Sequence, residues 1–216
     1  MNIDMETAKI MGLAYLLGSL PFAWIAGKLL RGIDIRRHGS GNAGATNAWR
    51  VLGPGPGLTV GALDMAKGWA AVAMAGWISD NPAVGIRLGA GLFAVAGHTW
   101  PVWLGFRGGK GVLTAGGAFL NLAWLPMACS LAVFILVFKA SGYVSLGSIT
   151  ASAALPLFIL LIRGPWHEWQ ILATSLAVAV FILVMHVPNI RRLLRGDEHG
   201  FKAKSGRKPG KKRGKL

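Results

Sequence analysis

Apolar runs long enough to cross a lipid bilayer recur along this chain, and they constrain its fold more than any other feature. Residues 5–30 form one such run with few charges, and residues 169–185 form another with none. About 20 consecutive apolar residues span the hydrocarbon core of a membrane. Only 14% of the 216 residues are charged, against about 25% in a typical soluble domain. The sequence therefore predicts an all-α, polytopic integral membrane protein.

The number of membrane crossings depends on residues 112–139, where Pro126 could kink one long helix or separate two short ones. Basic segments follow the first, third and last apolar runs, and loops rich in Lys and Arg stay cytoplasmic. Seven crossings place all three basic segments on the same side of the membrane, whereas six would place the last one opposite the first. This favours two crossings, or a re-entrant pair, within residues 112–139. We therefore expect seven transmembrane helices, with the N-terminus outside and the C-terminus cytoplasmic. The candidate spans are residues 8–29, 60–78, 84–104, 112–124, 127–139, 143–162 and 168–186.

The two ends of the chain lead to further expectations. The N-terminus lacks the basic region of a cleaved signal peptide, so the first span should be permanent. Residues 1–200 should form a single transmembrane domain and residues 201–216 a separate tail. Residues 202–215 carry eight Lys and Arg and no acid, a composition that nucleic-acid-binding arms share. Beside a membrane span it favours a disordered cytoplasmic tail near anionic lipids, so no nucleic-acid partner is expected.

Metal and disulfide chemistry are both disfavoured. The single cysteine, Cys129, excludes an intrachain disulfide and a multi-cysteine metal site. No cluster of His, Cys, Asp and Glu has metal-ligand spacing. We therefore expect neither a metal nor another cofactor.

A polar loop at residues 39–50 reads Gly-Ser-Gly-Asn-Ala-Gly-Ala-Thr-Asn-Ala-Trp-Arg. Its glycines let backbone N–H groups turn toward one point, and such nests bind anions. Residues 39–44 match G-x-G-x-x-G, but no buried strand precedes them, so a dinucleotide-binding fold is not supported. The simpler alternative is a flexible loop made of turn-forming residues.

Two further polar motifs are expected to belong to the same site as this loop. Residues 105–111 read Gly-Phe-Arg-Gly-Gly-Lys-Gly, and a helix is expected to begin after them. A helix N-terminus favours phosphate, although the spacing does not match a nucleotide P-loop. The alternative is that Arg107 and Lys110 anchor the chain on the cytoplasmic side. Residues 186–192, His-Val-Pro-Asn-Ile-Arg-Arg, end the last span.

Four ionisable residues within or near the spans are functional candidates, because such groups are costly inside a membrane. Asp64 and Lys67 are spaced i, i+3, so they share one helix face. They could neutralise one another, or the lysine could point at the polar site. His98 and His186 each lie near an inner helix end, where they could act in acid–base chemistry or serve only in packing.

Taken in order, residues 39–47, Gly97-His98 with Pro101, residues 106–112, and residues 186–192 with Gly196 and Glu198 resemble the bacterial membrane glycerol-3-phosphate acyltransferases that use acyl phosphate (the PlsY family). The resemblance extends from the first span to about Gly200. It departs at Arg107, where lysine is frequent. It implies seven transmembrane helices in the bacterial inner membrane and an active site that faces the cytoplasm.

The resemblance also implies an activity and its partners. Enzymes of this family transfer a fatty acyl group from acyl phosphate to the 1-hydroxyl of sn-glycerol 3-phosphate. The products are 1-acyl-sn-glycerol 3-phosphate (lysophosphatidic acid) and inorganic phosphate, in the first acylation of phospholipid biosynthesis. The implied partners are the two substrates, membrane lipids and a soluble acyl-phosphate synthase.

Acyl phosphate is already activated, so no acyl-enzyme nucleophile is required, and the sequence has no G-x-S-x-G motif. We expect the rate to come from positioning and charge stabilisation. The resemblance implies that the departing phosphate itself takes the hydroxyl proton. An anion transporter is disfavoured, because no internal repeat is visible and the motifs gather on one face.

The candidate catalytic residues are Ser40, Lys110, His186 and Asn189. The candidate phosphate-binding residues are Asn42, Arg50, Lys67, Arg107, Gly108, Gly109 and Gly111. The candidate supporting residues are Asn47, Asp64, His98, Thr114, Arg192 and Glu198.

Overall fold

The computed structural model describes residues 5–79, 82–164 and 169–201, and every regular element in these ranges is helical. This confirms the all-α prediction for the part of the chain described. The helices are α1 (Met5–Gly18), α2 (Phe22–Arg31), η1 (Ile35–Arg37), α3 (Ala45–Leu52), α4 (Pro54–Ile78), α5 (Val84–Thr99), η2 (Val102–Leu104), α6 (Val112–Leu122), α7 (Trp124–Ser141), α8 (Val144–Arg163), α9 (Trp169–Met185) and α10 (Val187–Arg195), of which η1 and η2 are 3₁₀ helices.

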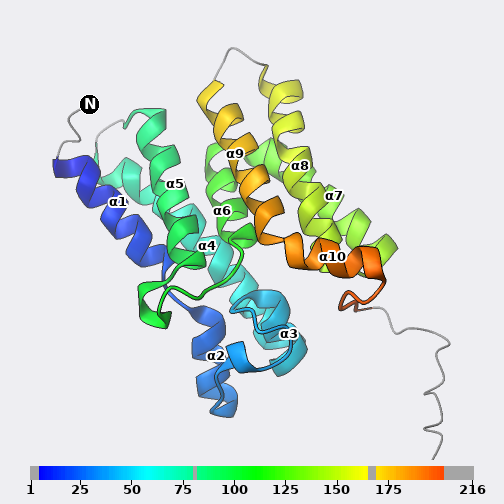
Figure 1. Ribbon diagram of the computed structural model, residues 1–216. Coiled ribbons are helices and arrows are strands. Elements are labelled where there is room, and N and C mark those ends of the chain that lie inside the picture. The colour runs from blue at the N-terminus through cyan, green and yellow to red at the C-terminus, as the bar shows by residue number, and fades with distance from the viewer. Residues whose placement is uncertain (1–4, 80–81, 165–168, 202–216) are drawn as a thin grey trace, which may run out of the picture.

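The long helices form a bundle, and the polar motifs lie at one end of it. Figure 1 shows α2 and α3 at the bottom of the view, with α10 and the loop between α5 and α6 directly above them, whereas α5 and α9 begin near the top. The three motifs therefore come together although about 140 residues separate the first from the last.

Glycines allow the central helices to approach closely. A Cβ atom added at Gly68 of α4 would stand 2.8 Å from the carbonyl carbon of Thr114, and one added at Gly117 of α6 would stand 2.8 Å from that of Met65. Small residues permit such contacts between membrane helices, where van der Waals packing replaces the hydrophobic drive for association. The α4–α6 pair thus forms a tight support beneath the polar end.

The expected spans differ from the observed helices at several ends. Residues 8–29 are not one continuous helix, because the helix is interrupted at residues 19–21. The carbonyl of Leu20 in this interruption accepts a hydrogen bond from Lys67 Nζ at 2.9 Å. The third helix ends at Thr99, five residues before the expected end, because Pro101 lacks an N–H and disfavours helical geometry at Trp100.

Residues 112–139 contain two helices, so the alternative of one long helix is wrong. The break lies at Ala123, three residues before Pro126. Pro126 instead occupies the first turn of α7, where a missing N–H costs no intrahelical hydrogen bond.

Length and composition alone identify fewer spans than the sequence predicted. Met5–Arg31, Trp124–Ser141 and Val144–Arg163 are long and apolar enough to cross a membrane. The pair Trp169–Met185 and Val187–Arg195, bent by 56°, adds a fourth if it is counted as one span. Seven crossings therefore remain a prediction, as does the orientation of the two ends.

Candidate active site

Asn47 holds the first polar loop in shape. Its side-chain oxygen accepts a hydrogen bond from Ser40 N–H at 2.8 Å, and its amide nitrogen donates to the carbonyls of Ile35 and His38 at 3.1 and 3.0 Å. The side chain is buried, so these bonds satisfy it inside the protein. Asn47 is therefore a support of the loop. The Ser40 side chain is exposed and that of Asn42 is half-buried, so both are open to a ligand.

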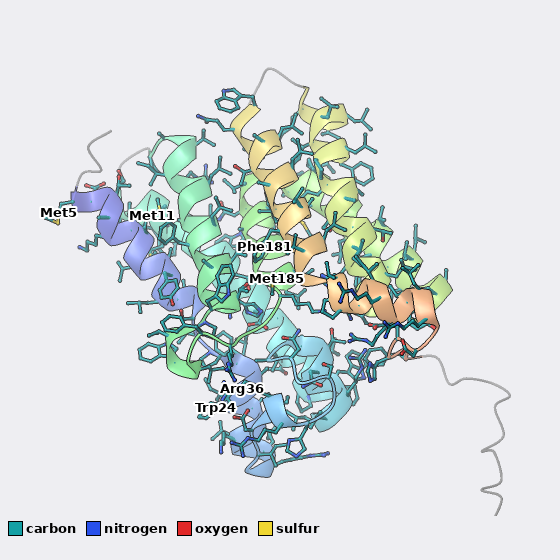
Figure 2. All side chains as sticks on the ribbon, viewed as in Figure 1. Met5, Met11, Trp24, Arg36, Phe181 and Met185 are labelled. Atoms are coloured by element: carbon teal, nitrogen blue, oxygen red, sulfur yellow. The ribbon has the colours of Figure 1, made fainter. Side chains whose placement is uncertain are left out.

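Arg36 links the segment just before the first loop to the segment just before the second, and it was not among the expected site residues. Its guanidinium donates to the carbonyl of Leu104 at 2.8 Å and forms an ion pair with Asp34. The hydrogen bond from Arg36 is the main reason why the pKa of Asp34 is lowered to about 2. Figure 2 shows Arg36 beside Trp24 at the polar end of the molecule. The Asp-x-Arg spacing was the only signal of this link in the sequence.

The second loop uses two of its glycines to pack against α5. Gly108 N–H donates to the carbonyl of Thr99, and Gly109 N–H donates to that of His98, each at 3.0 Å. These two N–H groups are thus engaged within the chain, which differs from the anion nest expected at Gly108 and Gly109. Gly111, with φ of 79°, precedes α6, and no side chain of the described residues caps the start of that helix, so its first N–H groups remain candidates for a ligand.

Lys110 lies at one end of a chain of hydrogen bonds that links the second and third motifs. Its Nζ donates to the side-chain oxygen of Asn189, and the Asn189 amide donates to Glu198 Oε1 at 2.6 Å. Glu198 also accepts from Ser145 Oγ at 2.8 Å and from Arg192 Nε at 2.7 Å. Ser145 was not expected here, because nothing near it in the sequence marks a polar site.

The charges of this cluster shift one another's protonation. Burial lowers the pKa of Lys110 to about 8, although the carboxylate of Glu198 acts in the opposite direction. Burial would raise the pKa of Glu198, but hydrogen bonds from Asn189, Arg192 and Ser145 outweigh it and lower that pKa. Glu198 is therefore an anion at neutral pH, and Lys110 is mostly a cation that can lose its proton under mildly alkaline conditions.

His186 lies at the bend between α9 and α10, buried beside this cluster. Its Nδ1 is 2.8 Å from the carbonyl oxygen of Ile182. A carbonyl can only accept a hydrogen bond, so Nδ1 carries the proton and a neutral His186 has a lone pair on Nε2. The ring is thus held in one tautomer with an acceptor to offer.

Arg50 on α3 reaches the segment that follows α10. Its Nη2 donates to the carbonyl of His199 at 2.7 Å, and its guanidinium carbon is 5.1 Å from the centre of the Phe201 ring. Phe201 lies one residue beyond the expected domain boundary, yet it packs against the bundle. The packed part of the chain therefore extends at least to Phe201.

A second buried cluster, made of Asp64, Lys67 and His98, lies against the loop at residues 105–111. Asp64 Oδ1 is 2.8 Å from Lys67 Nζ and 3.4 Å from His98 Nδ1. Lys67 thus forms the ion pair that was one of its two alternatives, and it also lines a small cleft. Ala43 and Gly108 line the same cleft, so the cluster touches both polar loops.

The remaining candidates lie outside these two clusters. Arg107 is exposed, and Thr114 is buried where α6 crosses α4. Phe181 of α9 packs edge-on against Trp100 at 5.8 Å between ring centres, next to the start of α6 (Figure 2). In the part of the chain that the structure describes, no group of three or more His, Cys, Asp or Glu could hold a metal ion.

Comparisons with known proteins agree with this arrangement. The family model described as glycerol-3-phosphate acyltransferase matches residues 8–196. A glycerol-3-phosphate acyltransferase from Desulforamulus reducens is 42% identical over 196 residues, which cover 91% of this chain and 96% of the relative. A glycerol-3-phosphate acyltransferase from a Synechococcus strain is 45% identical over 204 residues, which cover 93% of this chain and 99% of the relative.

Two crystal structures have the same fold. Both are of PlsY (YgiH), an integral membrane glycerol 3-phosphate acyltransferase. Its glycerol 3-phosphate form superposes with a TM-score of 0.83 at 37% identity, covering 91% of this chain and 96% of that one. Its lysophosphatidic acid form superposes with a TM-score of 0.81 at 36% identity, covering 91% of this chain and 95% of that one.

Proposed function

The chain belongs to the glycerol-3-phosphate acyltransferase family, and we propose that it transfers a fatty acyl group from acyl phosphate to the 1-hydroxyl of sn-glycerol 3-phosphate. The products are 1-acyl-sn-glycerol 3-phosphate and inorganic phosphate. The observation that carries the proposal is that Lys110 lies two residues before the first residue of α6, whose start no side chain of the described residues caps. A partly buried cation and a helix N-terminus together favour a phosphate group.

A second phosphate site is needed, because both substrates carry one. Arg50 and the open Ser40 and Asn42 side chains lie on the first loop and α3, at the same end of the bundle. We propose that the first motif and the Lys110 cluster each hold one phosphate. Asn47, Gly108, Gly109, Asp64 and His98 then act as supports that fix the shapes of the two loops.

The reaction requires no covalent enzyme intermediate. The 1-hydroxyl oxygen bonds to the acyl carbonyl carbon, the bond from that carbon to the phosphate oxygen breaks, and the departing phosphate accepts the hydroxyl proton. Lys110 and the α6 N-terminus stabilise the negative charge that develops on the leaving phosphate. His186 Nε2 and the Asn189 amide orient the hydroxyl toward the carbonyl, which supplies the effective concentration that the step needs.

The proposed setting is the bacterial inner membrane, with seven crossings, the N-terminus outside and the site on the cytoplasmic side. It is supported by the collection of the basic segments at the polar end of the bundle (Figure 1). A soluble synthase would deliver acyl phosphate to this face. Membrane lipids would surround the bundle and contact the basic residues 202–215.

The donor can be tested with purified protein. Palmitoyl phosphate and labelled glycerol 3-phosphate should give labelled lysophosphatidate, whereas palmitoyl-CoA and palmitoyl-acyl carrier protein should not replace the donor. Lys110→Ala is the matched loss-of-site variant. Comparable turnover of the wild-type protein with palmitoyl-CoA would refute the acyl-phosphate proposal.

A further inference from the structure

The last described segment, residues 197–201, runs from the end of α10 to the turn between α7 and α8, and we call it the strap. Backbone hydrogen bonds fix both of its ends. Asp197 N–H donates to the carbonyl of Arg192 at 3.0 Å, and Phe201 N–H donates to that of Gly142 at 2.9 Å. The strap therefore connects elements that lie far apart in the sequence.

Phe201 ends the strap inside a cup of three side chains. Its ring packs edge-on against Trp49 of α3 and Phe138 of α7, with 5.6 and 5.9 Å between ring centres. The Arg50 guanidinium carbon lies 5.1 Å from the ring centre, in a cation–π arrangement. Both kinds of contact are favourable, so the cup gives the strap a defined seat between α3 and α7.

Glu198 lies in the middle of the strap and is buried. Its carboxylate accepts hydrogen bonds from Ser145, Asn189 and Arg192. The strap itself makes no hydrogen bond to Lys110 among the contacts of the described residues, and its influence passes through the Asn189 amide. An amide that donates to a carboxylate turns its oxygen the other way, here toward the lysine.

We propose that Phe201 is a positioning residue for acyl transfer, because its seat in the cup holds Glu198 where the carboxylate turns the Asn189 amide toward Lys110. The inference rests on the proposed function, which places Lys110 at a substrate phosphate. The strap also holds Arg50, through the carbonyl of His199. One aromatic side chain outside the three motifs thus aligns residues from two of them.

The ionisation of Lys110 then depends on the strap. The charged and titratable groups that face Lys110 are Glu198 on the strap, Arg192 on α10, Arg50 on α3 and His186 at the end of α9. Of these, only Glu198 raises the pKa of Lys110, while Arg50 and Arg192 lower it. A loosened strap removes the carboxylate from its place and leaves the cations, so the lysine should lose its proton at lower pH.

The test compares full-length variants by kcat/KM for both substrates across a pH series. Phe201→Ala should lower kcat/KM by roughly 10- to 100-fold, because small displacements of positioned groups have effects of this size. It should also move the alkaline decline of kcat/KM to lower pH. Phe201→Tyr retains the ring and should retain the profile. Phe93→Ala, which removes a half-exposed ring of α5 far from the cup in sequence, is the matched control and should change neither.

Each outcome decides the matter. If Phe201→Ala does not elute as a monodisperse species, Phe201→Leu, which keeps apolar volume without the ring, takes its place. Wild-type kcat/KM in that variant would overturn the inference. A lower kcat/KM with an unshifted alkaline limb would overturn it too, because that result describes a merely structural role. A wild-type protein with no turnover of acyl phosphate would instead refute the proposed function.

Discussion

Gly109→Ala should disable the second loop through one steric overlap. The added Cβ would stand 2.8 and 2.9 Å from His98 Cε1 and Cδ2, and closer still to Nε2, whereas ordinary contact begins at 3.4 Å. The ring cannot move away freely, because it is buried and lies 3.4 Å from Asp64. Overpacking of this kind costs about 1–3 kcal/mol. Since Lys110 is the next residue, we expect the loop to shift and kcat/KM to fall about 100-fold.

A double-mutant cycle separates this overlap from a general effect on the loop. The three atoms nearest to the added Cβ all belong to the His98 ring. In a His98→Ala background, Gly109→Ala should therefore cost about tenfold less, a coupling of about 1.4 kcal/mol. Gly108→Ala is the matched control, because its Cβ meets the backbone carbonyl of His98 and the Pro101 ring, which His98→Ala leaves in place.

The assay is lysophosphatidate formation by each detergent-purified variant, after size-exclusion chromatography has shown a monodisperse species. The reasoning predicts strong coupling between positions 98 and 109 and little between 98 and 108. Near-normal kcat/KM in Gly109→Ala, or equal coupling at both glycines, would show that contact with His98 does not set the position of this loop.

Substitutions, pH, labelling and truncation test separate parts of the proposed site and topology. Lys110→Ala should lower kcat/KM by roughly 100-fold, about 3 kcal/mol, while exposed Arg107→Ala should cost less; near-normal activity of Lys110→Ala would exclude a phosphate role. In the wild-type protein kcat/KM should decline as pH rises through about 8, because Lys110 loses its proton; Glu198→Gln should move that decline to lower pH, and an unmoved decline would assign it to another group. Cysteines introduced at His38, Trp103 and Arg195 in a Cys129→Ala background should react only with a reagent applied from the cytoplasmic side. A cysteine at Ala83 should react only with an external reagent. Labelling of any of these positions from the other side would contradict the proposed topology. Removal of residues 202–216 should leave kcat/KM within a few-fold, whereas removal of Phe201 as well should lower it further; equal activity of the two truncated chains would contradict the domain boundary.

The sequence was sufficient to predict a helical membrane protein and the family. Long apolar runs allow few alternatives, and three motifs of unusual composition occur in a specific order. It also predicted that Lys110, His186 and Asn189 belong to one site, and the structure places them together. That prediction needed only the rule that successive antiparallel spans return basic loops to one face.

The sequence could not show which groups of the site are already occupied. The glycines at 108 and 109 suggested free N–H donors, but their pairing with the carbonyls of Thr99 and His98 depends on where α5 ends. Asn47 was expected as a supporting residue, but the sequence could not show which three loop groups it would bond. Ser145 and Phe201 join the site through tertiary packing alone, and no local motif marks either residue.

A dual-label transfer experiment tests the central claim most directly. Purified protein is given palmitoyl phosphate labelled with ³²P and glycerol 3-phosphate labelled with ¹⁴C. The account predicts that ³²P appears only in inorganic phosphate, that ¹⁴C appears only in 1-acylglycerol 3-phosphate, and that the two form in equal amounts. Retention of ³²P in the lipid product, or formation of labelled lysophosphatidate only after acyl-CoA is added, would contradict it.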